Sequence, residues 1–113
     1  MKRHKPRDPR KISEALFQEE VRKIALMHSW KYYHPWLSIH STGGYPDCTM
    51  VHAEKKRIIF AELKADGKEL RQDQQEWIDE LTTVTDAWLP GMRPEIYVWH
   101  PSDIEQIWEI LRR

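Results

Sequence analysis

Two charged residues, Glu62 and Lys64, continue an otherwise apolar stripe of side chains in the segment 57–64. Successive side chains of a strand point to opposite faces, so the even-numbered positions of this segment share one face. An unpaired buried carboxylate costs several kcal/mol and therefore needs a partner or a metal ion. The alternative is that Glu62 and Lys64 form an ion pair beyond the edge of the sheet.

Asp47 offers Glu62 a partner. It opens the preceding predicted strand, residues 48–52, directly after Pro46. Two consecutive strands joined by a short turn pair in antiparallel fashion, which would place Asp47 beside Glu62. Two carboxylates, together with the backbone carbonyl of Leu63, are oxygen ligands that suit Mg²⁺ or Mn²⁺.

Two further polar residues lie on apolar stripes of predicted helices. Glu14 belongs to a helix predicted over residues 13–28, on the side that faces the core, and would add a third carboxylate to the metal site. Gln74 falls on the buried stripe of a helix predicted over residues 69–83. Lys64 would stabilise the negative charge that develops on a phosphate or orient a water molecule.

The elements that must position these side chains follow from hydrophobic periodicity and turn residues. Their order, α-β-β-β-α-β-α, predicts an α/β fold with a central mixed sheet flanked by helices. The strand 58–63 is apolar on both faces and is expected at the centre. Ser13 is predicted as an N-cap, and Ser102 with Glu105 as a capping box. The expected helices and strands cover residues 13–28, 31–39, 48–52, 58–63, 69–83, 96–99 and 102–111.

At this point the sequence resembles the VRR-NUC family of PD-(D/E)xK nucleases, over about residues 12–111. Its signature is similar to residues 46–47 (PD) and 62–64 (ELK), which are separated by fourteen residues. Two features depart from the family pattern: Cys48 stands where an aliphatic residue is usual, and the loop 85–94 is long. Further similarity lies in residues 13–18 (SEALFQ), 44–47 (GYPD), 58–64 (IIFAELK) and 96–103 (IYVWHPSD), and in the single residues Leu70, Gln74 and Trp77.

The resemblance implies a restriction-endonuclease-like core and a metal-dependent DNA endonuclease that leaves a 5′-phosphate and a 3′-hydroxyl. Small stand-alone members, common in phages and bacteria, resemble Holliday-junction resolvases that act as homodimers. The partner would be branched or duplex DNA, and the cofactor Mg²⁺ or Mn²⁺. The resemblance assigns metal binding to Asp47, Glu62, the Leu63 carbonyl and Glu14, catalysis to Lys64, and a site role to Gln74.

Two rival functions use the same fold. One is a non-catalytic DNA-binding accessory module; a decayed member of that kind should have lost Asp47, Glu62 or Lys64, and all three are present. The other is a sequence-specific restriction nuclease, for which 113 residues leave little chain for base readout. The favoured hypothesis is therefore an endonuclease that selects its DNA by structure rather than by sequence.

Composition bounds the remaining possibilities. The 113 residues predict one domain, and 18 basic against 18 acidic residues exclude a uniformly basic nucleic-acid coat. Residues 1–11 carry six basic residues and one acidic residue, which predicts a flexible basic arm or a solvated tail before a nuclease domain at 12–113. The lone Cys48 excludes an intrachain disulfide. With no apolar run for a leader or a membrane span, a cytoplasmic protein is expected.

Other side chains are less suited to chemistry. His28 is expected in the core rather than at a metal, because the histidines do not cluster. Cys48 has no activating neighbour in the sequence and is not expected to be a nucleophile. Trp88 would stack on a base or pack as part of a lid. The core is expected to hold Trp77, Trp99 and Trp108.

Overall fold

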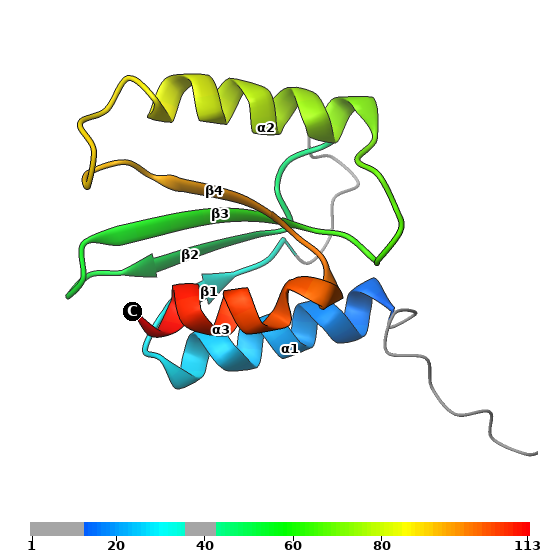
Figure 1. The fold of residues 1–113 in the computed structure, drawn as a ribbon, viewed down its shortest axis with the longest axis horizontal. Helices are drawn as coiled ribbons and strands as arrows, with labels where there is room; N and C mark the ends of the chain where they lie inside the picture. Colours follow the sequence, from blue (N-terminus) through cyan, green and yellow to red (C-terminus); the bar gives the residue numbers. More distant parts are fainter. Residues whose placement is uncertain (1–12, 36–42) are drawn as a thin grey trace, which may run out of the picture.

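The computed structural model describes residues 13–35 and 43–113, and its elements follow the predicted order (Figure 1). The predicted arm, residues 1–11, and residues 36–39 of the first predicted strand lie outside the described residues. The elements are α1 (Glu14–Met27), β1 (Lys31–Tyr33), β2 (Cys48–His52), β3 (Arg57–Leu63), α2 (Gln72–Thr85), β4 (Glu95–Trp99), the 3-10 turn η2 (Pro101–Asp103) and α3 (Ile104–Arg112).

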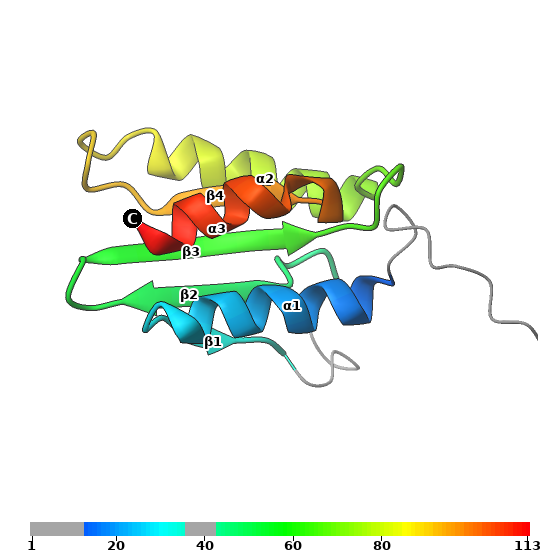
Figure 2. The same ribbon diagram turned by 60° about the horizontal axis from the view of Figure 1, so that its bottom comes forward.

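The four strands form one mixed sheet in the order β1-β2-β3-β4. β2 is antiparallel to both β1 and β3, whereas β3 and β4 are parallel. β3 therefore has a neighbour on each side, which confirms the central position predicted from its apolar faces. Figures 1 and 2 show α2 on one face of the sheet and α1 with α3 on the other. This is an α/β sheet flanked by helices, consistent with a restriction-endonuclease-like core.

The hydrophobic core lies between the sheet and the α1–α3 layer. Alternation along β3 points its odd-numbered side chains into this core and turns Glu62 toward the α2 face. Trp30, which the sequence did not place, closes the core by donating its indole N–H to the Leu111 carbonyl at 2.8 Å. The buried apolar side chains are Phe17, Val21, Ile24, Ala25, Trp30, Cys48, Met50, Ile59, Ala61, Leu63, Trp99, Ile107 and Leu111.

Helix starts depend on side-chain caps, and only one was predicted correctly. The Ser13 hydroxyl accepts the Leu16 N–H and begins α1, as expected. The second helix starts at Gln72 rather than 69, because Arg71 has an extended backbone and its N–H donates to the Gln74 side chain. Within residues 13–35 and 43–113, no helix combines the length and the apolarity that a membrane crossing needs.

The predicted capping box of Ser102 and Glu105 is wrong. The chain first makes the η2 turn, in which the His100 N–H donates to the Asp103 carboxylate at 2.9 Å. The Ser102 hydroxyl donates instead to Asp66 at 2.8 Å. This bond ties the start of the α3 region to the segment that follows β3.

The tryptophans divide between core and surface. Trp99 is buried, as predicted, whereas Trp77 is half-buried and Trp108 is 38% exposed, so Trp108 is not a core residue. Trp108 instead packs edge-on against His28, 5.4 Å between ring centroids. His28 is half-buried, and its Nδ1 lies 2.8 Å from the Ile24 carbonyl within its own helix. That contact gives it the structural role expected of it.

Arg57 secures the end of β3 that lies away from Glu62. Its guanidinium donates two hydrogen bonds of 2.8 Å to the Glu95 carboxylate at the start of β4. It donates a third bond to the Ile110 carbonyl in α3 and lies 4.8 Å from the centre of the Trp30 ring. Burial disfavours the charge of Glu95, but the bonds from Arg57 and Tyr97 outweigh it and lower the pKa of Glu95.

We expect Arg57→Ala to lower the free energy of unfolding by about 2–3 kcal/mol, because it removes two hydrogen bonds from the half-buried Glu95 carboxylate and leaves it only the bond from Tyr97. Urea unfolding followed by circular dichroism measures this. Arg22→Ala is the control: its ion pair with Glu19 is exposed, so its loss should change stability by less than about 0.5 kcal/mol. Equal midpoints for Arg57→Ala and wild type would contradict the assignment.

Candidate active site

The ends of β2 and β3 bring Asp47 and Glu62 together. The last pair of the antiparallel ladder is Cys48 with Ala61, so the same register puts Asp47 opposite Glu62. Asp47 Oδ2 accepts the backbone N–H of Leu63 at 2.8 Å, which fixes this carboxylate across the strand end. The juxtaposition expected from the antiparallel pairing is therefore present.

Glu62 is a carboxyl in an unfavourable place for a charge. Its side chain is 1% exposed, and Oε1 accepts a bond of 3.2 Å from the Gln74 amide. Oε2 is buried and meets no donor among the residues that the structure describes. Burial raises the pKa of Glu62 well above its ordinary range, and the adjacent Asp47 carboxylate raises it further. Lys64 and Arg71 oppose the rise only in part.

Gln74 is held in one orientation. Its Oε1 accepts the Arg71 N–H at 2.9 Å, so its NH₂ group is the end that faces Glu62. Gln74 is 7% exposed, which places a polar side chain of α2 under the sheet at the carboxylate pair. Arg71, which the sequence did not suggest, brings an exposed cation to the same helix start. The sequence signal for Arg71 is the Gln that follows it by three residues, because a Gln at the third position of a helix can accept the backbone N–H of the residue before the helix.

Lys64 and Glu14 both lie near the end of β3. Lys64 is 7% exposed and follows β3, and its N–H donates to the Trp99 carbonyl of β4 at 2.9 Å. Glu14 is exposed at the start of α1, and its Oε1 lies 3.4 Å from the Ala65 N–H. Glu14 thus touches the backbone just after Lys64 but does not join the carboxylate pair.

A glycine turn fits the Asp47 loop against α2. Gly44 is buried with φ +89°, and a Cβ there would lie 2.5 Å from the Asp73 carbonyl oxygen. Trp77 donates its indole N–H to the Gly43 carbonyl at 3.2 Å and packs edge-on against Tyr45. The loop that carries Asp47 is therefore locked to the helix that carries Gln74, which explains physically why Gly and Tyr precede Pro46.

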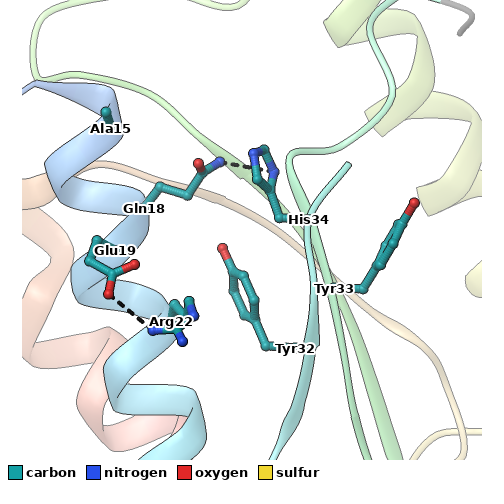
Figure 3. Close-up of a pocket in the computed structure, with 7 residues that line it drawn as sticks. All are labelled: Ala15, Gln18, Glu19, Arg22, Tyr32, Tyr33 and His34. Atoms are coloured by element: carbon teal, nitrogen blue, oxygen red, sulfur yellow. Dashed lines mark hydrogen bonds and ion pairs between the residues drawn. The ribbon is translucent and has the colours of Figure 1, made fainter. Parts of the chain in front are cut away.

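A pocket of about 530 Å³ lies beside the site, between α1 and β1 (Figure 3). Within it, the His34 ring nitrogen Nδ1 is 2.7 Å from the Asp47 carbonyl and 3.2 Å from the Gln18 amide. Nδ1 donates to the Asp47 carbonyl in one tautomer of the ring and accepts from the Gln18 NH₂ group in the other. His34 thereby supports the Asp47 backbone, a role that its position in the sequence did not reveal.

Cys48 and Trp88 show no catalytic arrangement. Cys48 is 1% exposed, and burial raises the pKa of its thiol to about 12, so it is no nucleophile at neutral pH. Trp88 follows α2 and is 52% exposed, with its carbonyl accepting a bond from Arg93 at 2.9 Å. It does not pack as a closed lid over the carboxylates.

The sequence profile of the VRR-NUC domain matches residues 9–95, a stretch that includes Glu14, Asp47, Glu62, Lys64 and Gln74. The chain belongs to the VRR-NUC family. Members of this family are generally nucleases, so the domain is of a nuclease type that processes DNA. Searches of curated proteins and of solved structures each found no match.

The donor set of this VRR-NUC domain fits a divalent cation, on which nucleases of the family generally depend. Asp47 and Glu62 are adjacent oxygen ligands, and the buried Glu62 Oε2 has, among the described residues, no partner for the hydrogen bond that a buried polar atom requires. Across residues 13–35 and 43–113, however, no three acidic, histidine or cysteine side chains gather closely enough for a metal. The expected third carboxylate, Glu14, is therefore not brought to the pair.

Glu62→Gln should stabilise the metal-free VRR-NUC domain at pH 8 by about 1–3 kcal/mol. The folded wild type keeps a proton that the unfolded chain releases, so its stability falls as the pH rises above about 4.3, the ordinary glutamate pKa. The side-chain amide of the variant does not ionise, so the variant does not lose stability in this way as the pH rises. Urea unfolding in EDTA at pH 4, 6 and 8 measures the gap, which should close at pH 4.

The control is Glu54→Gln, which changes an exposed acid in the turn between β2 and β3. Its stability should follow the wild type at every pH. A gap between Glu62→Gln and wild type that stays constant from pH 4 to pH 8 would contradict the raised pKa of Glu62.

Proposed function

We propose that the protein is a Mg²⁺- or Mn²⁺-dependent DNA endonuclease. One observation carries this proposal: half-buried Asp47 and buried Glu62 form a carboxylate pair next to the buried Lys64, and one Glu62 oxygen meets no donor in the part of the chain that the structure describes. A structural ion pair would satisfy its own oxygens. A site for a cation leaves an oxygen available to bind it.

Each residue has a distinct task in the proposal. Asp47, Glu62 and the Leu63 carbonyl hold the cation, which supplies positive charge and lowers the pKa of a bound water molecule. The Lys64 ammonium stabilises the charge that develops on the scissile phosphate during in-line attack. Gln74 fixes the Glu62 carboxylate, and Glu14 steadies the strand end through the Ala65 N–H. The products would be a 5′-phosphate and a 3′-hydroxyl.

The proposed substrate is branched DNA of the Holliday-junction kind, processed in the cytoplasm of a bacterial or phage-infected cell. The protein has no net charge, so general attraction to DNA would fall to the basic residues 1–11. Labelled junction, flap, single-stranded and duplex DNA, each with Mg²⁺, Mn²⁺ or EDTA, test the preference. Junction cleavage in either metal and none in EDTA is expected. Equal cleavage of every DNA form would exclude structure selectivity.

Asp47→Ala, Glu62→Ala and Lys64→Ala should each lower the cleavage rate at least ~10³-fold, because each removes charge at the reacting phosphate. Removing the Asp47 carboxylate also removes repulsion, so DNA binding by Asp47→Ala without metal should tighten. Single-turnover cleavage and fluorescence anisotropy measure the two effects. A folded variant that cleaves at the wild-type rate would refute the assignment of that residue, and DNA binding without cleavage by the wild type would favour the accessory module.

Glu54→Ala serves as the matched control, because this acid is exposed and lies in the turn at the far end of β2. It should cleave like the wild type. Glu14→Ala and Gln74→Ala should give intermediate losses of about 10–100-fold, as expected for groups that orient ligands rather than provide them. Unfolding of these two variants without a specific loss of rate would assign them to stability alone.

A homodimer is part of the proposal, since two symmetric incisions need two sites related by a twofold axis. Exposed apolar side chains at the end of α2 and in the following loop support a partner surface there: Val84, Trp88, Leu89 and Met92 are 61%, 52%, 70% and 67% exposed. Light scattering should give twice the 13.7 kDa chain mass, and Leu89→Glu should give a monomer. A wild-type monomer, with and without junction DNA, would contradict the dimer.

A further inference from the structure

The helix α2 starts with a residue type that does not suit the position. Arg71 is the N-cap, and its backbone has the extended conformation of that position, with φ −67° and ψ 162°. Side chains that stabilise an N-cap accept an N–H of the first helical turn. The guanidinium of Arg71 has no acceptor and makes no such bond to α2. Its positive charge also lies at the positive end of the helix dipole, so the helix itself gives no reason for an arginine here.

Arg71 lies beside the carboxylate pair. Its N–H donates to Gln74 Oε1 at 2.9 Å, and the Gln74 amide in turn donates to Glu62 at 3.2 Å. The Arg71 Nε bonds one oxygen of Asp73 at 3.2 Å. A Cβ on Gly43 would lie 2.9 Å from the other Asp73 oxygen. The guanidinium is therefore found where the start of α2 meets the loop that leads into β2.

The ion pair with Asp73 does not explain the arginine. The two side chains are 63% and 46% exposed, so their attraction contributes little to stability. Asp73 also has another partner, because its Oδ1 accepts the Gln74 N–H at 3.0 Å. Its negative charge is favourable at a helix start even without the arginine. Arg71 thus brings to this place an exposed cation that the helix does not need.

The carboxylate pair repels the phosphates of DNA, and two cations oppose that repulsion. Lys64 and Arg71 are the positive groups that act against the rise in the pKa of Glu62, which places both charges within electrostatic reach of this carboxyl. Lys64 is only 7% exposed and is assigned to the scissile phosphate. The exposed guanidinium of Arg71 suits a phosphate outside the buried site, because it can donate paired, parallel hydrogen bonds to phosphate oxygens.

We propose that Arg71 binds a DNA phosphate next to the scissile one, and that this contact explains why a helix-capping residue does not occupy the position. The inference rests on the proposed function, since it takes the carboxylate pair as the place of cleavage. Arg71 fixes the path of the DNA strand across the start of α2. It is a DNA-binding residue and takes no part in breaking the bond.

The first measurement is stability in EDTA. Arg71→Ser places a hydroxyl acceptor on a backbone that already has N-cap geometry, and Gln74 already accepts the N–H of that position. The two side chains would then form a complete capping box, so the urea midpoint should rise above that of the wild type. Arg71→Lys keeps the charge and adds no cap, so it should unfold like the wild type. If Arg71 served stability, Arg71→Ser would unfold at lower urea.

The second measurement is the salt dependence of DNA binding. Lys64→Ala retains the cation ligands and should leave labelled junction DNA uncut, so binding can be followed in Mg²⁺ by fluorescence anisotropy. Adding Arg71→Ser to this variant should raise the dissociation constant about 10-fold. The slope of log affinity against log KCl should become shallower by up to about 0.9, as expected for one lost phosphate contact. Adding Arg71→Lys instead should preserve most of the slope.

Arg112→Ser is the matched control, because it also removes one exposed arginine that pairs with a helix acid. Arg112 lies in the last turn of α3, and its carbonyl accepts a bond from Lys55, in the turn at the far end of β2. In the Lys64→Ala background it should change neither affinity nor slope. With Lys64 retained, single-turnover cleavage by Arg71→Ser should need more enzyme for half-saturation, while its maximum rate changes less than about 3-fold.

The outcomes separate this inference from the proposed function. An unchanged salt slope for Arg71→Ser would overturn the phosphate contact, and a lower urea midpoint would overturn the claim that this contact replaces a cap. A lowered maximum rate with an unchanged half-saturating enzyme concentration would also overturn it, since Arg71 would then act on the carboxylate pair. A wild type that binds no Mg²⁺ and cuts no DNA would overturn the proposed function, and the salt slope would still decide whether Arg71 binds a phosphate.

Discussion

Two carboxyl groups forced together in a poorly hydrated place are the constraint on which the functional end of this molecule depends. Asp47 and Glu62 meet because β2 and β3 pair antiparallel, and neither the register nor the strand ends can shift without separating them. The surrounding features each serve this pair. Gly44 lets the Asp47 loop lie against α2, and Gln74 donates to Glu62 from that helix. The stability lost in burying the pair is offset in the core on the other face of the sheet.

The two ends of β3 are built in opposite ways. At its start, Arg57 satisfies Glu95 with two bonds and reaches the α3 backbone, so charges there are fully partnered. At its end, a carboxylate oxygen of Glu62 has no donor among the described residues. A single strand thus joins a closed, stabilising end to an open, reactive one. Because of this difference, substitution of Arg57 should lower stability, whereas substitution of Glu62 by Ala should lower the cleavage rate.

The order of elements and the central strand could be predicted because hydrophobic periodicity depends on the chain alone. The pairing of Asp47 with Glu62 followed from strand ends and a short turn. Details that depend on one side chain choosing among several partners could not be predicted. Ser102 could have capped a helix, but its hydroxyl donates to Asp66 instead. The Gln74 side chain accepts the Arg71 N–H, and α2 therefore begins later than predicted. Glu14 lies on the predicted face of α1, yet it reaches the Ala65 backbone rather than the carboxylate pair.

The burial of Cys48 has a practical consequence for anyone who wishes to watch this protein. It is the single cysteine of the chain, it lies in β2, and its thiol is both covered and hard to ionise. Alkylating reagents attack thiolates, so they will spare the folded protein. A second cysteine introduced on the surface can therefore carry a fluorophore without replacing the native one. In the unaltered chain, the rate at which Cys48 becomes modified reports how often β2 leaves the sheet.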